Sequence, residues 1–121
     1  MKRVFLVDDE REMTELTSAF LRMNGFEVEA SNDSAEALER LKTDAFSAVI
    51  VDLMMFPMDG MELLRRVREL PGHAATPLYV MSCKPLTDLE RKDLLRMRVT
   101  YFSKPMHPRL LAQRLKTELG P

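Results

Sequence analysis

The chain has few of the residues that would mark it as secreted, zinc-binding or membrane-spanning. Its single cysteine, Cys83, cannot form an internal disulfide and has no partner for a zinc site, so we expect it to fill a small buried apolar space. No apolar stretch approaches the roughly 20 residues that span a bilayer. The N-terminal sequence MKRVFLVDDE has too short an apolar run for a secretory signal, which predicts a cytoplasmic protein.

The chain also lacks a marked excess of either charge, because its formal net charge is -1. This balance hides a division: residues 1–60 hold 6 Lys or Arg against 13 Asp or Glu, and residues 61–121 hold 12 against 6. The basic residues of the second half are interspersed with acids and carry no interleaved aromatics, which is more typical of solvated helix faces than of a nucleic-acid surface. A basic surface for a protein partner stays open, but we predict no direct nucleic-acid binding and no membrane binding.

Short apolar runs alternate with helical patterns along the whole sequence. The apolar runs read as strands buried on both faces of a parallel sheet, which predicts an α/β fold. Five strands are expected, at 3–7, 26–30, 46–51, 78–81 and 99–102. Glutamates interrupt the second strand, which places it at an edge, and the third is the most apolar and therefore central. Residues 1–121 are thus predicted to form one domain, a flavodoxin-like doubly wound (βα)5 fold with helices on both faces.

The predicted helices have apolar faces and recognisable start signals. The first is expected to bury the apolar residues that recur at helical spacing before Asn24-Gly25, namely Met13, Leu16, Phe20 and Met23. The next three begin where a capping residue precedes a glutamate by three positions, at Asp33 and Glu36, Asp59 and Glu62, and Thr87 and Glu90. Pro108 opens the last helix.

Polar side chains with complementary chemistry follow four of the strands: Asp8 and Asp9, then Asp52, Ser82 and Lys104. Ligands of such sheets bind outside the carboxyl ends of the strands, so we expect one edge to gather all five. Adjacent carboxylates repel unless a cation neutralises them, and their hard oxygens suit Mg²⁺, or Mn²⁺ in its place. Asp52 could then act as a nucleophile toward phosphorus. A hydroxyl and an ammonium would meet the charge and oxygens of the phosphoryl group.

Each of these residues also has a structural explanation when taken alone, as a helix cap, a turn residue or a loop residue before proline. Their joint placement favours phosphoryl chemistry. A phosphatase or mutase with an aspartyl nucleophile would usually carry a second Asp two positions later, but Met54 stands there, so we do not expect an enzyme. A flavin or nucleotide site would want small and hydroxyl residues after the first strand, where this chain has DDERE.

The chain resembles the receiver domains of bacterial two-component response regulators, the group that includes the single-domain chemotaxis regulator. The resemblance is carried by VDDE at 7–10, VDLMM at 51–55, MDG at 58–60, MS at 81–82 and TYFSKP at 100–105. Ser82 and Lys104 follow Asp52 by 30 and 52 positions, as in the family. The resemblance implies that Asp52 is the phosphoacceptor and that the metal is held by Asp8, Asp9, Asp52 and the backbone carbonyl of Met54.

The resemblance also implies that Ser82 and Lys104 contact the phosphoryl group, that Tyr101 is an aromatic switch, and that Lys104-Pro105 is a cis peptide. The donor would be a sensor histidine kinase or a histidine phosphotransfer protein. The recipient would be a downstream target or an output domain missing from this chain. The domain would be a monomer or a phosphorylation-linked dimer, with at most self-phosphorylation and self-dephosphorylation at Asp52.

Two regions depart from the family pattern. The family usually has Pro four residues after the phosphoacceptor, where this chain has Phe56 followed by Pro57, and it usually has Ala or Gly where this chain has Cys83. Met54 and Lys84, which flank the site, are an unusual pair, so we expect an altered rate of phosphate loss. These departures keep a second hypothesis open, in which the chain is a protein interaction module that works without phosphorylation.

Overall fold

The computed structural model describes residues 1–120, and its five strands form one parallel sheet in the order β2-β1-β3-β4-β5. The strands are β1 (Arg3–Val7), β2 (Glu27–Ser31), β3 (Ala48–Asp52), β4 (Leu78–Ser82) and β5 (Val99–Ser103). The predicted edge position of β2 and the central position of β3 are both confirmed. β3 starts two residues later than expected and runs on to Asp52, because Asp52 still pairs with Met81 of β4.

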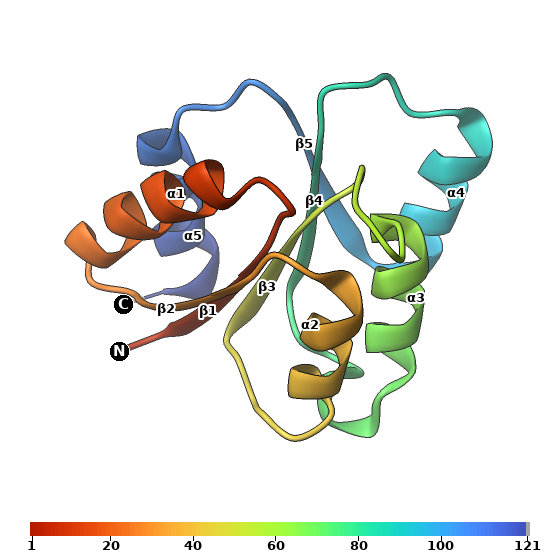
Figure 1. Ribbon diagram of the computed structural model, residues 1–121, viewed down its shortest axis with the longest axis horizontal. Helices are drawn as coiled ribbons and strands as arrows, with labels where there is room; N and C mark the ends of the chain where they lie inside the picture. Colours follow the sequence, from red (N-terminus) through yellow and green to blue (C-terminus); the bar gives the residue numbers. More distant parts are fainter. Residues whose placement is uncertain (121) are drawn as a thin grey trace.

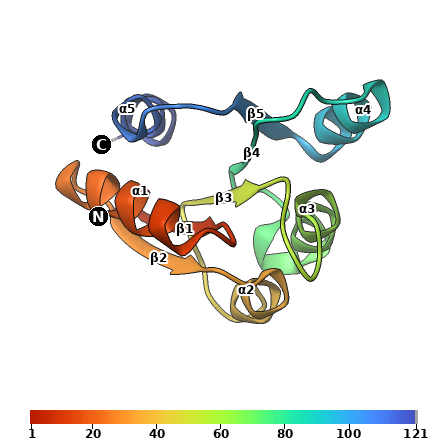
Figure 2. The same cartoon turned by 45° about the horizontal axis from the view of Figure 1, so that its top comes forward.

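Helices cover both faces of the sheet, as predicted. α1 (Arg11–Met23) and α5 (Pro108–Leu119) lie on one face, and α2 (Ser34–Leu41), α3 (Gly60–Glu69) and α4 (Asp88–Met97) lie on the other (Figure 1, Figure 2). A short 3₁₀ turn, η1 (Pro71–His73), leads toward β4. None of the helices in residues 1–120 is long and apolar enough to cross a membrane.

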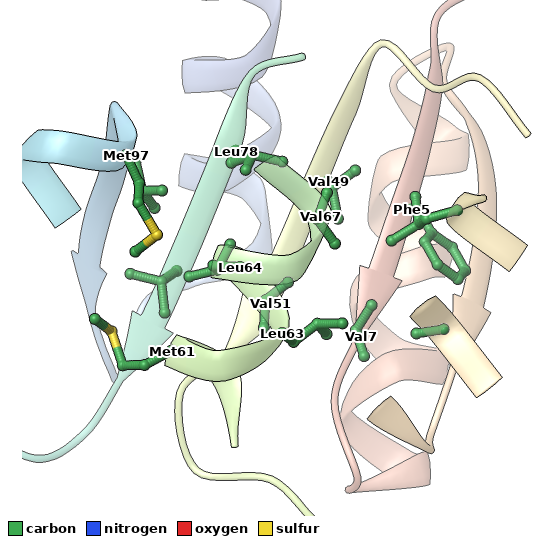
Figure 3. Packing of buried hydrophobic residues seen from close by; sticks show 14 of the residues in the cluster. Phe5, Val7, Val49, Val51, Met61, Leu63, Leu64, Val67, Leu78 and Met97 are labelled. Carbon is green, nitrogen blue, oxygen red and sulfur yellow. The ribbon is translucent and has the colours of Figure 1, made fainter. Parts of the chain in front are cut away.

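The larger apolar cluster lies under α2, α3 and α4. Leu63, Leu64 and Val67 of α3 are fully buried and point at Val49 and Val51 of β3 (Figure 3). Removing a side chain of this size from water stabilises the fold by about 1.5–3 kcal/mol. This face therefore holds the middle of the sheet rigidly, and β3 delivers Asp52 to the carboxyl edge from a fixed position.

The buried face of α1 is not the one that the apolar spacing predicted. Of the four predicted residues, Met13, Leu16 and Met23 are exposed and Phe20 is half-buried, and the buried residues of the helix are Thr14, Ser18 and Leu21. Small hydroxyl side chains let the helix approach the sheet closely, and their polar atoms can bond within the fold. The Thr14 hydroxyl, for example, donates to the carbonyl of Arg11 at 2.8 Å.

Only one of the three predicted capping boxes is complete. Thr87 and Glu90 exchange both hydrogen bonds at the start of α4. Asp33 and Asp59 do cap α2 and α3, as expected. The glutamates of those two pairs have other partners: the Glu36 carboxylate accepts from Ser31, and the Glu62 carboxylate pairs with two arginines, Arg65 and Arg66.

At the amino edge of the sheet, where the N-terminal ends of the strands lie, two polar side chains stabilise the connecting segments by bonding to backbone carbonyls. His73 is buried, with Nε2 2.8 Å from the carbonyl of Leu41 and Nδ1 3.0 Å from the hydroxyl of Thr76. The Arg68 guanidinium donates to the carbonyls of His73 at 2.9 Å, Thr76 at 2.8 Å and Met97 at 2.8 Å. These bonds join the ends of α2 and α4 to the turn before β4.

Candidate functional site

The fold brings the three predicted carboxylates together at the carboxyl edge. Asp8 and Asp9 follow β1, Asp52 ends β3, and these two strands are neighbours at the point where the strand order changes direction. One carboxylate oxygen from each residue lies within 4.8 Å of the others. Asp52 is buried, Asp8 is half-buried and Asp9 is exposed, so the cluster opens toward solvent on the Asp9 side.

Lys104 reaches this cluster from the loop after β5, the blue segment that arches over the top of Figure 1. Its Nζ lies 3.2 Å from Asp8 Oδ2 and 3.4 Å from Asp52 Oδ1. Its backbone N–H donates to the carbonyl of Ser82 at 2.8 Å, which fixes the loop against the end of β4. One ammonium group therefore serves two carboxylates, and the three acids keep an excess of negative charge.

That excess changes the protonation of Asp52. Burial raises the pKa of its carboxyl group from 3.8 to about 6, with a further rise from the charge of Asp8, although Lys104 and the N–H of Met54 act in the opposite direction. Burial alone would lower the pKa of Lys104. The charges and hydrogen bonds from Asp8 and Asp52 outweigh burial and raise that pKa above its ordinary value.

Ser82 lies at the same edge but turns its hydroxyl to the next loop. The side chain is fully buried, and its Oγ donates to the carbonyl of Lys84 at 3.2 Å and accepts from the N–H of Lys84 at 3.1 Å. The Tyr101 hydroxyl is 3.5 Å from the Ser82 carbonyl, longer than an ordinary O–H···O bond. Tyr101 is half-buried and packs against the apolar cluster of α2, α3 and α4.

The side chain of Lys84 is held at α4, away from the three acids. Its Nζ lies 2.8 and 3.0 Å from the two oxygens of Glu90. The same carboxylate accepts the N–H of Thr87 at 2.8 Å in the capping box. The hydrogen bonds from Lys84 and from the Thr87 N–H lower the pKa of Glu90. The loop after β4, whose Lys84 backbone bonds to the Ser82 hydroxyl, is thus tied to the start of α4.

The loop after Asp52 carries exposed apolar side chains. Met54 is exposed, and Phe56 is 77% exposed. The peptide bonds Phe56-Pro57 and Lys104-Pro105 are both cis. The cis bond at Lys104-Pro105 confirms the prediction, whereas the one at Phe56-Pro57 was not predicted.

Cys83 corrects the prediction of a buried apolar filler, because it is exposed. It follows the last residue of β4, where the alternation of inward and outward side chains ends. Cys83 lines a cavity beside Asp52 and Lys104.

Two supporting residues were missed from the sequence. The side-chain amide of Asn32 donates to the carbonyl of Asp8 at 2.7 Å and to the hydroxyl of Thr14 at 3.1 Å, which braces the turn after β1. A Cβ atom on Gly60 would lie 2.5 Å from the carbonyl oxygen of Asp52. The role of Gly60 could have been found from the Asp-Gly pair at the start of α3. The role of Asn32 could have been found only from the presence of an Asn directly after β2.

The comparisons with known proteins agree with this fold. The family model of the response regulator receiver domain matches residues 4–116, so the chain belongs to the response regulator receiver domain family. Such a domain is a phosphoacceptor in two-component signal transduction, and this is the signalling role of the chain. A phosphorylation-independent module is not favoured.

Relatives of known sequence or structure include full regulators and isolated receiver domains. The chain is 32% identical over 120 residues to a CpxR homologue, a transcriptional regulatory protein of Haemophilus influenzae, covering 98% of this chain and 51% of that protein. A CheY-like receiver domain protein of Methanospirillum hungatei has a TM-score of 0.90 at 25% identity, covering 98% of this chain and 94% of that one. The chain thus spans about half the length of the curated relatives that it matches.

A third relative is a solved receiver domain that holds a metal ion. The receiver domain of the sensor histidine kinase PA1611 of Pseudomonas aeruginosa has the same fold, with a TM-score of 0.86 at 21% identity, covering 99% of this chain and 98% of that one. That domain has a magnesium ion coordinated in its active site cleft.

Proposed function

We propose that Asp52 accepts a phosphoryl group from a phosphohistidine of a sensor histidine kinase or a histidine phosphotransfer protein. The observation that carries the proposal is the meeting of three carboxylates and Lys104 at one edge, from positions as much as 96 residues apart. The whole chain, residues 1–121, is proposed to act as one receiver domain in the cytoplasm.

The donor set fits Mg²⁺, with Mn²⁺ as a substitute. Three carboxylates within 4.8 Å of one another supply hard oxygens, and a single lysine leaves their charge unbalanced. Asp8, Asp9 and Asp52 would hold the ion, together with the backbone carbonyl of Met54. When bound, the ion neutralises the acids and binds phosphoryl oxygens. The magnesium ion in the PA1611 receiver domain supports this assignment.

The residues of the chain have distinct roles in the transfer. A carboxylate oxygen of Asp52 attacks phosphorus as the bond from phosphorus to the donor's imidazole nitrogen breaks with its electron pair on that nitrogen, which gives an aspartyl phosphate and the free imidazole of the donor. The ammonium of Lys104, already 3.4 Å from Asp52 Oδ1, offsets the added charge. The protein is a stoichiometric acceptor, and only self-phosphorylation and self-dephosphorylation at Asp52 would be catalytic.

Phosphorylation would change the shape of the domain through Ser82. If Ser82 and Lys104 each gain a charge-assisted hydrogen bond of about 1.5–3 kcal/mol, the sum is about 3–6 kcal/mol. Shifting a population from 1:99 to 99:1 needs about 5.5 kcal/mol. Ser82 would leave Lys84, Tyr101 would move into the space, and the surface of residues 84–114 would change for a target or an output domain. A change from monomer to dimer is one form of that output.

The phosphoacceptor role is tested with acetyl phosphate and Mg²⁺, followed by intact mass. We expect a gain of about 80 Da in the native chain and none in Asp52→Asn. A gain that persists in Asp52→Asn would assign the phosphoryl group to another residue. No gain in the native chain would favour the phosphorylation-independent module.

The switch is tested separately, by amide chemical shifts before and after phosphorylation. In the native chain we expect shift changes over residues 84–114. In Ser82→Ala they should stay close to Asp52. If Ser82→Ala changes the distant amides as much as the native chain does, the route through Ser82 is wrong.

A further inference from the structure

The turn that carries Asp8 and Asp9 is held by the loop that follows β2. The side-chain amide of Asn32, the first residue after β2, donates to the carbonyl of Asp8 at 2.7 Å and to the hydroxyl of Thr14 in α1 at 3.1 Å. The backbone N–H of Asp8 donates to the carbonyl of Ser31 at 3.2 Å. The peptide groups on both sides of Asp8 are therefore hydrogen-bonded to residues 31 and 32.

The carbonyl that accepts from Asn32 belongs to the peptide that joins the two acids. A peptide unit is planar, so a hydrogen bond to its oxygen restricts both the ψ angle of Asp8 and the φ angle of Asp9. The Asp8 carboxylate is also held directly, because Oδ1 accepts from the N–H of Glu10 at 2.9 Å and Oδ2 from Lys104 at 3.2 Å. Asp9 is exposed, so the direction of its carboxylate depends mainly on this backbone.

The loop that carries Asn32 is itself fixed from the other side. The Asp33 side chain caps α2. The hydroxyl of Ser34, which is fully buried, accepts from the backbone N–H of Met58 at 2.8 Å. The loop is thus bonded both to the turn after β1 and to the loop after β3. Asn32 cannot follow Asp8 if the acidic turn shifts, so its hydrogen bond resists that shift.

The two acceptors explain why residue 32 carries an amide. The Thr14 hydroxyl donates its own hydrogen to the carbonyl of Arg11 at 2.8 Å, so it can only accept from Asn32. The Asp8 carbonyl is an acceptor as well. An amide nitrogen supplies two N–H donors, one for each acceptor, whereas a carboxylate supplies none.

We propose that Asn32 is a positioning residue for the metal site, which sets the affinity for Mg²⁺ by fixing the direction of the Asp9 carboxylate relative to that of Asp8. The inference rests on the assignment of Mg²⁺ to these acids in the proposed function. Residues that orient metal ligands without touching the metal typically change metal affinity by about 10–100-fold when they are replaced. Asn32 acts through the backbone, so we expect the lower end of that range.

Two substitutions remove the N–H donors in different ways. Asn32→Ala shortens the side chain, and Asn32→Leu keeps roughly its size and its neutral charge. Both should raise the Mg²⁺ dissociation constant of the full chain about tenfold, measured by titration calorimetry. Native affinity in Asn32→Leu would overturn the proposal, because that variant has no donor for the Asp8 carbonyl.

Asn24 gives a matched control at the opposite end of α1. Like Asn32, it is half-buried, and its amide donates to a backbone carbonyl, that of Phe20, at 2.8 Å. Asn24→Ala should lower the urea midpoint about as much as Asn32→Ala does, and it should keep the native Mg²⁺ dissociation constant. An equal loss of Mg²⁺ affinity in the two variants would contradict a positioning role, because general loosening of α1 would explain it.

Carbonyl chemical shifts test the contact without any metal. In the metal-free protein, the ¹³C signal of the Asp8 carbonyl should move in Asn32→Ala and in Asn32→Leu, because the carbonyl loses a hydrogen bond. The same signal should stay in place in Asn24→Ala. An Asp8 carbonyl signal that does not move in either Asn32 variant would remove the physical basis of the proposal.

Excess Mg²⁺ distinguishes positioning of the metal ligands from contact with the phosphoryl group. If Asn32 acts through metal affinity, phosphorylation of Asn32→Ala by acetyl phosphate should be slow at low Mg²⁺ and should return to the native rate as Mg²⁺ saturates the site. A deficit that persists at saturating Mg²⁺ would contradict a role through metal affinity.

Failure of this role and failure of the proposed function have different signatures. If the native chain binds Mg²⁺ and is labelled at Asp52, but the Asn32 variants bind Mg²⁺ equally well, only the role of Asn32 is wrong. If the native chain neither binds Mg²⁺ nor is labelled, the proposed function fails and the role of Asn32 falls with it.

Discussion

The two edges of the sheet hold polar groups in opposite ways. At the amino edge, Arg68 and His73 bond to backbone carbonyls, so each polar group has a complementary partner. At the carboxyl edge, three carboxylates meet, the one lysine beside them pairs with only two, Asp8 and Asp52, and the pKa of Asp52 rises to about 6. The first arrangement stabilises the chain by itself. The second leaves an electrostatic conflict that a cation or a proton relieves.

The comparison predicts opposite responses to mutation. Substitutions at the amino edge should destabilise the chain under all conditions, because they leave carbonyls without donors. Removal of an acid at the carboxyl edge should stabilise the metal-free chain, because it removes repulsion.

The largest effect is expected at the amino edge. Arg68→Met removes three hydrogen bonds of 2.8–2.9 Å to carbonyl oxygens, and we expect a loss of about 3–4 kcal/mol in urea unfolding. Arg66→Met is the matched control on the same helix, because Arg66 is exposed and, within residues 1–120, pairs only with Glu62. Its loss should stay below about 0.5 kcal/mol. Equal losses in the two variants would contradict the fastening role of Arg68.

At the carboxyl edge, Asp52→Asn should stabilise the metal-free chain at pH 7.5 by about 2–3 kcal/mol. The folded-state pKa of about 6 lies above the ordinary 3.8, so the native fold binds the Asp52 proton more tightly than the unfolded chain does. That contribution to stability is present below pH 3.8 and is lost as the pH rises to about 6.

Urea unfolding at two pH values checks this prediction. The native chain and Asp52→Asn should have similar stability near pH 4 and should differ at pH 7.5. Mg²⁺ should narrow the difference at pH 7.5, because it stabilises the native chain. An Asp52→Asn variant that is less stable than the native chain at pH 7.5 without metal would refute the electrostatic conflict.

A smaller effect is expected at Gly60, where the acid site meets α3. Gly60→Ala places a Cβ 2.5 Å from the carbonyl oxygen of Asp52 and 2.7 Å from the Cα of Leu53, both backbone atoms. We expect a loss of about 2 kcal/mol and slower phosphorylation by acetyl phosphate, because Asp52 must shift. Gly72→Ala is the control, because its Cβ would meet nothing within 4 Å. Equal stability of both variants would show that the approach at Gly60 is tolerated.

The smallest effect is expected at Glu90, which joins the loop between β4 and α4 to the first turn of α4. Glu90→Gln weakens the bonds to Lys84 and to the Thr87 N–H, and we expect a loss of about 1 kcal/mol in thermal unfolding. Glu69→Gln changes an exposed glutamate on α3 and should cost almost nothing. A larger loss for Glu69→Gln than for Glu90→Gln would rule out the tie.

The sequence was most informative where a pattern has one physical cause. The apolar runs predicted all five strands, and the carboxyl ends of parallel strands must share an edge, so the meeting of Asp8, Asp52 and Lys104 followed. The prediction from sequence failed at α1, because Met13 and Met23, whose apolar spacing predicted the buried face, are exposed.

The reasons for the failures are tertiary. Close packing of α1 on the sheet selects small side chains such as Ser18, and apolar spacing alone cannot register this. The exposure of Cys83 depends on where β4 ends, and the Lys84 pair with Glu90 depends on how the next loop turns. Pairings of this kind are set by loop paths, which carry no periodic signal.

In the proposed switch, the two hydrogen bonds between Ser82 and Lys84 would also set the background activity of the unphosphorylated protein. Two neutral bonds of about 1 kcal/mol each bias the Ser82 rotamer by a factor of about 30. About one molecule in thirty would then point its hydroxyl toward the acids without any phosphate. A regulator with this switch would have a measurable background output, and a weaker pair of hydrogen bonds would raise that output.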